Sequence, residues 1–202
     1  MFFLKFILSI LIILINFNSI LKAETLTFPT NLVANTTDFI LLTLHRAENV
    51  DDKKTLSTII KAICTSKKKI IFPIHPRTYK RLKEFNLLHK LQTSKMITLL
   101  DATGYFEMLE LMKKCSFIIT DSGGIQEEST ASQIRKKTFV VRKTTDRPEA
   151  VEYGFSDLIG TNYAKIVHAI KYGDRYRVPK RKSPYGNGYS SKMIISHIRK
   201  NI

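Results

Sequence analysis

Short apolar runs alternate with helix-like patterns along most of this chain, and this alternation constrains the fold more than any other feature. The runs are rich in β-branched and aromatic residues, which favour strands, and several are followed by segments with apolar residues at helical spacing. Strands that alternate with helices at this spacing form a parallel sheet covered by helices. We therefore predict an α/β fold. The expected strands are residues 39–44, 70–74, 96–100, 117–120 and 138–141.

Three helices are expected between these strands. The first has apolar residues on one face, and Asp51 or Asp52 suits its N-cap. The second should carry Leu82, Phe85 and Leu88, and the third covers about residues 105–113. Pro73 cannot donate a ladder hydrogen bond, so it marks either the end of its strand or an edge strand.

The segment DSGGIQEE, residues 121–128, joins an expected strand to an expected helix. Because Gly123 and Gly124 lack side chains, backbone N–H groups can approach an anion there, and the positive end of a helix favours negative charge. Ser122 adds a hydroxyl group, and Glu127 or Glu128 could accept hydrogen bonds from ribose hydroxyls. The alternative interpretation is a plain turn with a serine N-cap.

Polar clusters follow the other expected strands as well. His45, His75, Ser122 and Arg147 each come shortly after a strand, and ligands of parallel sheets gather beyond the carboxyl ends of the strands. We therefore expect these four residues on one rim. For each histidine the alternative is a loop residue that is bonded to a backbone carbonyl group.

Six segments of the chain together resemble one family, the non-hydrolysing UDP-N-acetylglucosamine 2-epimerases, in their C-terminal nucleotide-binding domain. Their order and spacing match that domain from about residue 38 to the end of the sequence. The segments are TLHRAENV (residues 43–50), FPIHPRT (72–78), LLDATGYFEMLELM (99–112), TDSGGIQEE (120–128), TTDRPEAVEYG (144–154) and SPYGNGYSSKMI (183–194).

The resemblance implies one half of a two-domain enzyme of the glycosyltransferase-B type, with two Rossmann-like halves and the active site between them. Such enzymes invert C2 of the sugar by eliminating UDP to a glycal intermediate and adding it back. This reaction interconverts UDP-N-acetylglucosamine and UDP-N-acetylmannosamine without a nicotinamide or a metal, so we expect no cofactor. Stabilisation of the departing pyrophosphate and acid/base groups at C2 must then come from the protein.

The resemblance also implies two groups of site residues. In the first, Glu128 holds the ribose, Met108 stands near the uracil where the family commonly has Phe, and the serine and glycines cradle the diphosphate. This UDP-binding group consists of Ser122, Gly123, Gly124, Glu128 and Met108. The second group lies around the pyrophosphate and the cleft, and its expected catalytic residues are His45, His75 and Arg147. Arg46 and Glu48 belong to the same loop as His45, and no catalytic role is assigned to them.

Some features depart from the family pattern. The N-terminal domain, which supplies carboxylates for the chemistry at C2, has no counterpart here, so we expect the chain to bind UDP weakly and to be inactive alone. A separately encoded N-terminal half could restore activity, and a homodimer could bury the exposed face. After Glu128 the sequence STASQIRKK lacks the usual C-cap glycine, so the register of residues 129–137 is uncertain. Asn187 replaces a more usual Asp in a turn that tolerates either.

We divide the chain into a hydrophobic leader (residues 1–23), a polar linker (24–37) and the nucleotide-binding domain (38–202). Residues 2–21 contain a single charged residue, Lys5, which suits a signal peptide or a membrane anchor. A third interpretation is translated sequence upstream of a broken gene. Because UDP-sugars are cytosolic, the resemblance places the domain in the cytoplasm, while the leader leaves an anchored or exported form open.

The net charge of +16, from 33 Lys and Arg against 17 Asp and Glu, raises a different class of function, binding of nucleic acid or another polyanion. Basic clusters at residues 67–69, 135–137 and 180–182 support it. The lysines are scattered, however, and no aromatic stacking motif accompanies them, so we consider nucleic acid an unlikely partner. A glycosyltransferase half-domain is the other alternative, because it shares the fold. Cys64 and Cys115 fall on apolar positions and are expected to be free thiols.

Overall fold

The computed structural model describes residues 38–201 of the chain. The predicted leader and the predicted linker, residues 1–37, lie outside the described residues. Among residues 38–201, no helix has both the length and the apolar character that crossing a membrane requires.

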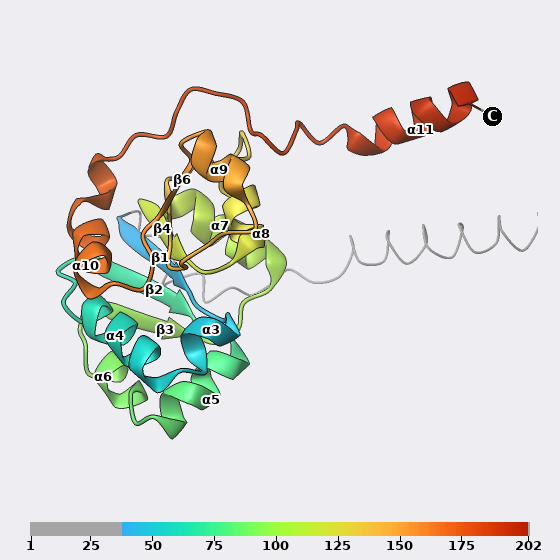
Figure 1. Cartoon of the computed structure of the whole chain (residues 1–202). Helices are drawn as coiled ribbons and strands as arrows, with labels where there is room; N and C mark the ends of the chain where they lie inside the picture. The colour runs from blue at the N-terminus through green and yellow to red at the C-terminus, as the bar shows by residue number, and fades with distance from the viewer. Residues whose placement is uncertain (1–37, 202) are drawn as a thin grey trace, which may run out of the picture. The chain divides into compact units, whose positions relative to one another are not determined.

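Six parallel strands form a single sheet in the order β3-β2-β1-β4-β5-β6 (Figure 1). The pairing of β1 with β4 joins segments about 77 residues apart and aligns Leu42 with Ile119. The strands are β1 (Phe39–Thr43), β2 (Lys69–Pro73), β3 (Ile97–Leu100), β4 (Phe117–Thr120), β5 (Thr138–Val140) and β6 (Ser156–Leu158).

Helices connect the strands and cover the sheet (Figure 1). In the first half of the described chain they are α3 (Ala47–Val50), α4 (Lys53–Ile63), α5 (Pro76–Glu84), α6 (Leu88–Gln92) and α7 (Tyr105–Lys114). In the second half they are α8 (Gly123–Glu128), α9 (Pro148–Glu152), α10 (Tyr163–Tyr172), the 3-10 helix η1 (Gly173–Arg175) and α11 (Ser190–Asn201).

The predicted fold class is confirmed, and all five predicted strands are present with ends shifted by no more than one residue. The sequence analysis missed β6, whose three residues, Ser-Asp-Leu, form no apolar run. The single helix expected to carry Leu82, Phe85 and Leu88 is wrong, because Asn86 adopts a left-handed φ of 57° that ends α5 before α6 begins. Pro73 is the last residue of β2, which pairs on both sides and is not an edge strand.

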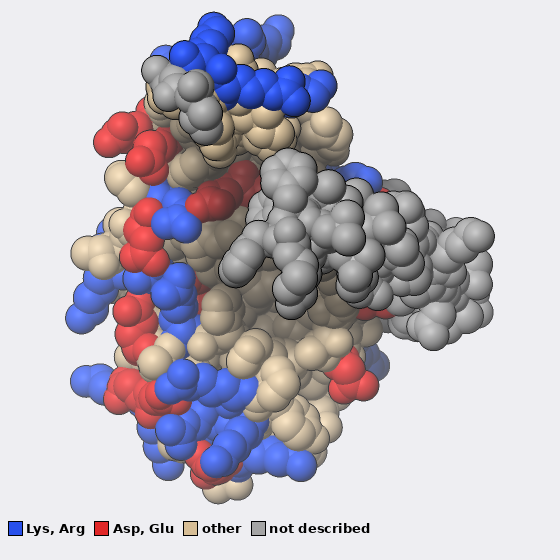
Figure 2. All heavy atoms as spheres, turned by 90° about the vertical axis from the view of Figure 1, so that its right-hand side faces the viewer, with Lys and Arg blue, Asp and Glu red and all other residues tan. Residues whose placement is uncertain are grey.

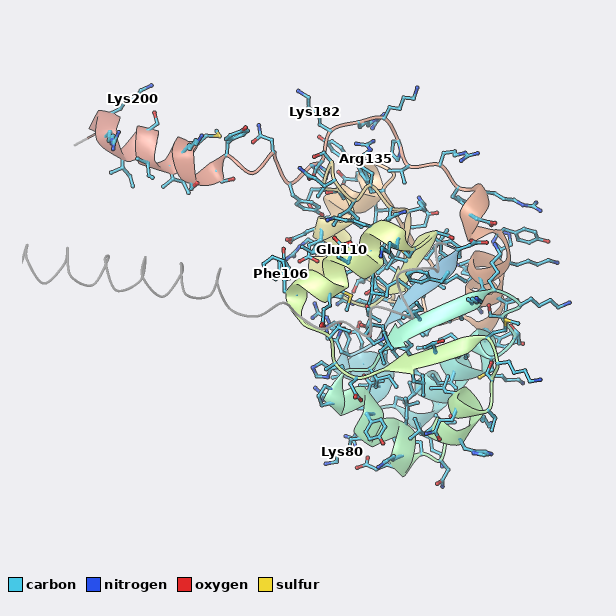
Figure 3. The ribbon with its side chains drawn as sticks, turned by 180° about the vertical axis from the view of Figure 1, so that it is seen from behind. Lys80, Phe106, Glu110, Arg135, Lys182 and Lys200 are labelled. Atoms are coloured by element: carbon cyan, nitrogen blue, oxygen red, sulfur yellow. The ribbon has the colours of Figure 1, made fainter. Side chains whose placement is uncertain are left out.

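Alternate side chains of the strands point to opposite faces of the sheet, and both faces are covered. One face carries Ile40, Leu42, Phe72 and Ile119, which pack in one cluster with the buried residues of α4, α5, α6 and α10. Helix α7 contacts β1 from the other face, where Figure 3 shows it in front of the sheet. Burial on both faces explains why the strands are continuous apolar runs rather than alternating ones.

The segment after α8 lacks the glycine that the family uses, and another residue takes the unusual conformation. Arg135 has a φ of 45°, and its backbone N–H donates to Ala131 O. Its guanidinium donates to the backbone carbonyls of Arg181 (3.0 Å) and Pro179, so the side chain joins this turn to the segment that follows η1. Figure 3 marks Arg135 and Lys182 in this part of the molecule. A glycine at this position would have no side chain to make these two contacts.

We predict that Gly173→Ala lowers the free energy of unfolding by about 1–3 kcal/mol, as overpacking of a full core does. A Cβ at this position would lie 2.6 Å from Cζ of Phe117, whose ring is fully buried. Chemical denaturation of the full chain measures the change. In a Phe117→Leu background the same substitution should cost less, because the clashing ring is gone. Equal costs in the two backgrounds would contradict this packing account.

Candidate functional site

The candidate site lies where the order of the strands reverses. β1 and β4 are neighbours in the middle of the sheet, and the connections that follow them lead to opposite edges. A crevice forms at the carboxyl ends of strands at such a point, and ligands of doubly wound sheets bind there. The loops after β1, β2 and β4 meet at this crevice and carry His45, His75 and Ser122.

A pocket of about 200 Å³ occupies the crevice. His45, His75, Met108 and Ser122 all line it, so the structure brings together four of the eight predicted site residues. Thr103 also lines it, and its buried hydroxyl oxygen has no hydrogen-bond partner in the described part of the chain. Met108 lines the pocket from α7, so the start of this helix lies beside it. Phe106, also near the start of α7, is 64% exposed and is labelled in Figure 3.

The carboxylate of Asp121 organises the loop after β1 from beneath. It is fully buried and accepts hydrogen bonds from the backbone N–H groups of His45 (3.0 Å to Oδ1) and Arg46 (2.9 Å to Oδ2). The side-chain amide of Asn49 donates to the same carboxylate (3.1 Å) and to the Val141 carbonyl (2.7 Å). One buried acid thus connects the ends of β1, β4 and β5. We missed Asp121 and Asn49 in the sequence, because an Asp after a strand gives no sign that it will be buried.

The rings of His45 and His75 lie side by side, with their centroids 5.7 Å apart. Nδ1 of His45 is 3.3 Å from Oδ1 of Asp121. Burial of the ring lowers the pKa of His45, and the nearby His75 and Arg46 add to this effect, while Asp121 opposes it. Nδ1 of His75 accepts a hydrogen bond from the backbone N–H of Arg77 (3.2 Å), which caps α5. Among residues 38–201, neither histidine side chain is hydrogen-bonded to the backbone carbonyl that the alternative interpretation supposed.

Two arginines surround the first glycine of α8. A Cβ at Gly123 would lie 3.6 Å from Nη2 of Arg46 and 3.9 Å from Cζ of Arg147, so both guanidinium groups border this backbone. Ser122 is the N-cap, and its hydroxyl accepts from the Ile125 N–H (3.4 Å). Ser122 is therefore the N-cap of α8, as the alternative interpretation supposed, and the start of the helix at Gly123 lies next to the guanidinium groups of Arg46 and Arg147.

The two carboxylates at the end of α8 have different surroundings. Glu127 forms an ion pair with Nε of Arg147. Glu128 is half-buried, and this burial, followed by the charge of Glu127, raises the pKa of the Glu128 carboxyl. The carboxylate that the resemblance assigns to the ribose is thus the one that Arg147 does not engage.

A second ion-pair network stiffens the surrounding loops. The nearly buried guanidinium of Arg142 pairs with Glu48 (2.7 Å) and Asp146 (3.0 Å), and Asp146 also contacts Arg46 (3.3 Å). Glu48 therefore has a structural partner in Arg142. Arg142 was missed in the sequence, where it resembles any other arginine after a strand.

On the face drawn in Figure 2, the Lys and Arg side chains do not form one continuous patch. Along the left and lower parts of that view, Lys and Arg side chains lie among Asp and Glu side chains, while a separate group of Lys and Arg side chains lies at the top. Several of the basic residues are paired, such as Lys68 with Asp174 and Lys113 with Glu110. This pattern is typical of a solvated surface rather than of a nucleic-acid groove. Both cysteines are free thiols as expected, and burial raises the pKa of Cys115 to about 12.

The fold defines a class of protein, an α/β domain of the kind found in glycosyltransferase-B-like enzymes. The family model described as UDP-N-acetylglucosamine 2-epimerase matches residues 14–199. The chain belongs to this family. The match includes the loops that carry the pocket and most of α11.

Individual relatives support this assignment. A UDP-N-acetylglucosamine 2-epimerase of Methanocaldococcus jannaschii is 46% identical over 164 residues, which are 78% of this chain and 43% of the relative. A solved structure of a Methanocaldococcus jannaschii enzyme, in complex with UDP-GlcNAc and UDP, superposes with a TM-score of 0.75 at 39% identity and covers 90% of this chain and 50% of its own. A Pseudomonas aeruginosa UDP-2,3-diacetamido-2,3-dideoxy-D-glucuronate 2-epimerase is 32% identical, over 88% of this chain and 49% of its own. The chain thus spans about half the length of these relatives.

We predict that Glu128→Gln raises the free energy of unfolding at pH 7 and leaves it unchanged near pH 3. The folded-state pKa of Glu128 lies above its unfolded value, so the wild-type carboxyl favours the folded state when protonated and loses that advantage as the pH rises through the folded pKa. The Gln side chain does not ionise, so the variant does not lose stability in this way as the pH rises. Half-exposure keeps the gain small.

Denaturation curves at the two pH values measure this difference. Glu152→Gln changes the net charge equally at an exposed position and serves as the control. A Glu128→Gln protein that is less stable than wild type at pH 7 would show that this carboxylate stabilises the ligand-free fold.

Proposed function

We propose that this domain binds the UDP part of a UDP-N-acetylhexosamine and forms one half of a 2-epimerase site. The observation that carries the proposal is the convergence of His45, His75 and Ser122 on one pocket at the strand-order reversal, next to the arginines that border Gly123. Relatives whose structures contain UDP-GlcNAc and UDP support it.

Each part of the site has a proposed role. The amides of Gly123 and Gly124, the Ser122 hydroxyl and the Arg147 guanidinium meet the diphosphate, because N–H and guanidinium donors match phosphate oxygens. Glu128 accepts hydrogen bonds from the ribose hydroxyls. Met108 covers the uracil ring with a polarizable side chain.

The histidines face the sugar and the pyrophosphate in this proposal. In the complete reaction the C2 proton and UDP leave to give a glycal, and UDP returns as a proton adds to the other face of C2. Because UDP-sugars are cytosolic, we place this activity in the cytoplasm.

Titration of the full chain with UDP should show binding that Glu128→Ala weakens by about 10-fold to 100-fold. A hydrogen bond to a charged group contributes about 1.5–3 kcal/mol, and each 1.4 kcal/mol is about tenfold in affinity. Calorimetry measures both proteins, and Glu152→Ala is the charge-matched control at an exposed position. Equal affinity in all three proteins would place the ribose elsewhere, and no binding by the folded wild-type chain would refute the proposed UDP site.

We further propose that a domain corresponding to the unmatched part of the relatives completes the site, whether it lies on the same polypeptide or another. Helix α11 supplies a surface for it. Met193, Ile194, Ile195 and Ile198 are between 48% and 70% exposed in this helix. A 12-residue helix is marginal in water unless its apolar face is packed, so this face suits a folded partner.

A polypeptide that corresponds to the unmatched half of the Methanocaldococcus jannaschii relative should co-purify with this chain and give epimerisation of UDP-N-acetylglucosamine, which the chain alone does not catalyse. Ile195→Asp should abolish the association, because it places a charge in the apolar contact. Ser196→Asp adds the same charge at an exposed polar position of α11 and should have little effect. Epimerisation by the chain alone would overturn the need for a second half.

A further inference from the structure

The two pocket histidines are held by different kinds of neighbour. A neutral imidazole carries one hydrogen, on either Nδ1 or Nε2, and the partner of one nitrogen decides which nitrogen has it. The same side chain can therefore present either a hydrogen-bond acceptor or a donor to a ligand. His45 and His75 both line the pocket, so their tautomers decide what the pocket offers chemically.

His45 faces an acceptor at Nδ1. Among residues 38–201, the groups at hydrogen-bond distance from the Asp121 carboxylate are N–H donors: the backbone of His45 and Arg46 and the side-chain amide of Asn49. An oxygen of this carboxylate, Oδ1, lies 3.3 Å from Nδ1 of His45. A lone pair on Nδ1 would be repelled by that oxygen, so the hydrogen resides on Nδ1. Nε2 of His45 is then an acceptor.

His75 faces a donor at the same ring position. The backbone N–H of Arg77 donates to Nδ1 of His75 at 3.2 Å. This contact requires a lone pair on Nδ1, so the hydrogen of the neutral ring resides on Nε2. The contact belongs to the N-terminal cap of α5, which the Pro at the first position of that helix helps to fix.

We propose that Asp121 and the Arg77 amide hold His45 and His75 in opposite tautomers, so that one pocket presents an acceptor at Nε2 of His45 and a donor at Nε2–H of His75. With ring centroids 5.7 Å apart, the two groups can engage one ligand. Asp121 is in this view a positioning residue. The assignment depends on contacts within this chain, and only the identity of the ligand atoms that meet the two nitrogens rests on the proposed function.

The charges around His45 support a neutral ring. Burial, His75 and Arg46 lower the pKa of His45, and Asp121 alone among the named neighbours raises it. A neutral His45 with a fixed tautomer can accept a proton or a hydrogen bond at Nε2, while the adjacent His75 can donate a hydrogen bond through Nε2–H, so the pair can hold one ligand by an acceptor and a donor.

The tautomers can be measured directly by ¹⁵N NMR of the full chain, because imidazole nitrogens with and without hydrogen resonate at well-separated shifts. The spectrum is recorded at about pH 8.5, above the usual pKa of histidine, and without ligand. The chain has five histidines. His45→Gln and His75→Gln assign the two signals, and the exposed His89 is an internal reference for an unconstrained ring.

We expect the Nδ1–H form at His45 and the Nε2–H form at His75. In Asp121→Asn, the single carbonyl oxygen should take the place of Oδ2, which has contacts from His45, Arg46 and Asn49, and the NH₂ group should then face Nδ1 of His45. His45 should therefore change to mainly Nε2–H with a further lowered pKa, while His75 stays unchanged.

Identical tautomers in the wild-type spectrum would overturn the proposal, and so would an unchanged His45 in folded Asp121→Asn. If the variant does not fold, the wild-type spectrum still decides. Because the measurement uses no ligand, its failure is distinct from a failure to bind UDP.

Discussion

The buried carboxylate of Asp121 is the interaction on which the site depends. A carboxylate without water is costly unless donors surround it, and here backbone amides of the β1 loop and the side chain of Asn49 do so. The loop donates to this carboxylate through the backbone amides of His45 and Arg46, and in this conformation His45 lines the pocket. Stability and site geometry therefore come from the same contacts.

Around this centre, the loops are held mainly by charge pairs. Arg142 joins Glu48 to Asp146, and Arg147 engages Glu127. The guanidinium groups of Arg46 and Arg147 border the backbone of Gly123, so two positive charges lie at the start of α8. The sheet supplies the frame for this arrangement, since β1 and β4 are adjacent and their loops must meet.

Much of the fold could be predicted, because strands buried on both faces have to be apolar. β6 could not, since its short polar segment at the edge of the sheet depends on pairing with β5 and not on its own composition. The meeting of His45, His75 and Ser122 followed from the rule that strand ends share a rim. The role of Arg135 in the turn after α8 could not follow, because the carbonyls that its guanidinium contacts lie more than 40 residues further along the chain.

The α/β class, five of the six strands and the family were predictable from the sequence alone, because these rest on periodicity and on motifs that are local in the chain. Tertiary structure decided which charges are buried and which partners they have. Asp121 and Asp51 each stand two residues before a helix, α8 and α4, yet Asp121 is buried beside His45 while Asp51 pairs nearer the surface with Arg77 and Arg81. That difference is set by residues far apart in sequence, whose proximity exists only once the sheet has formed.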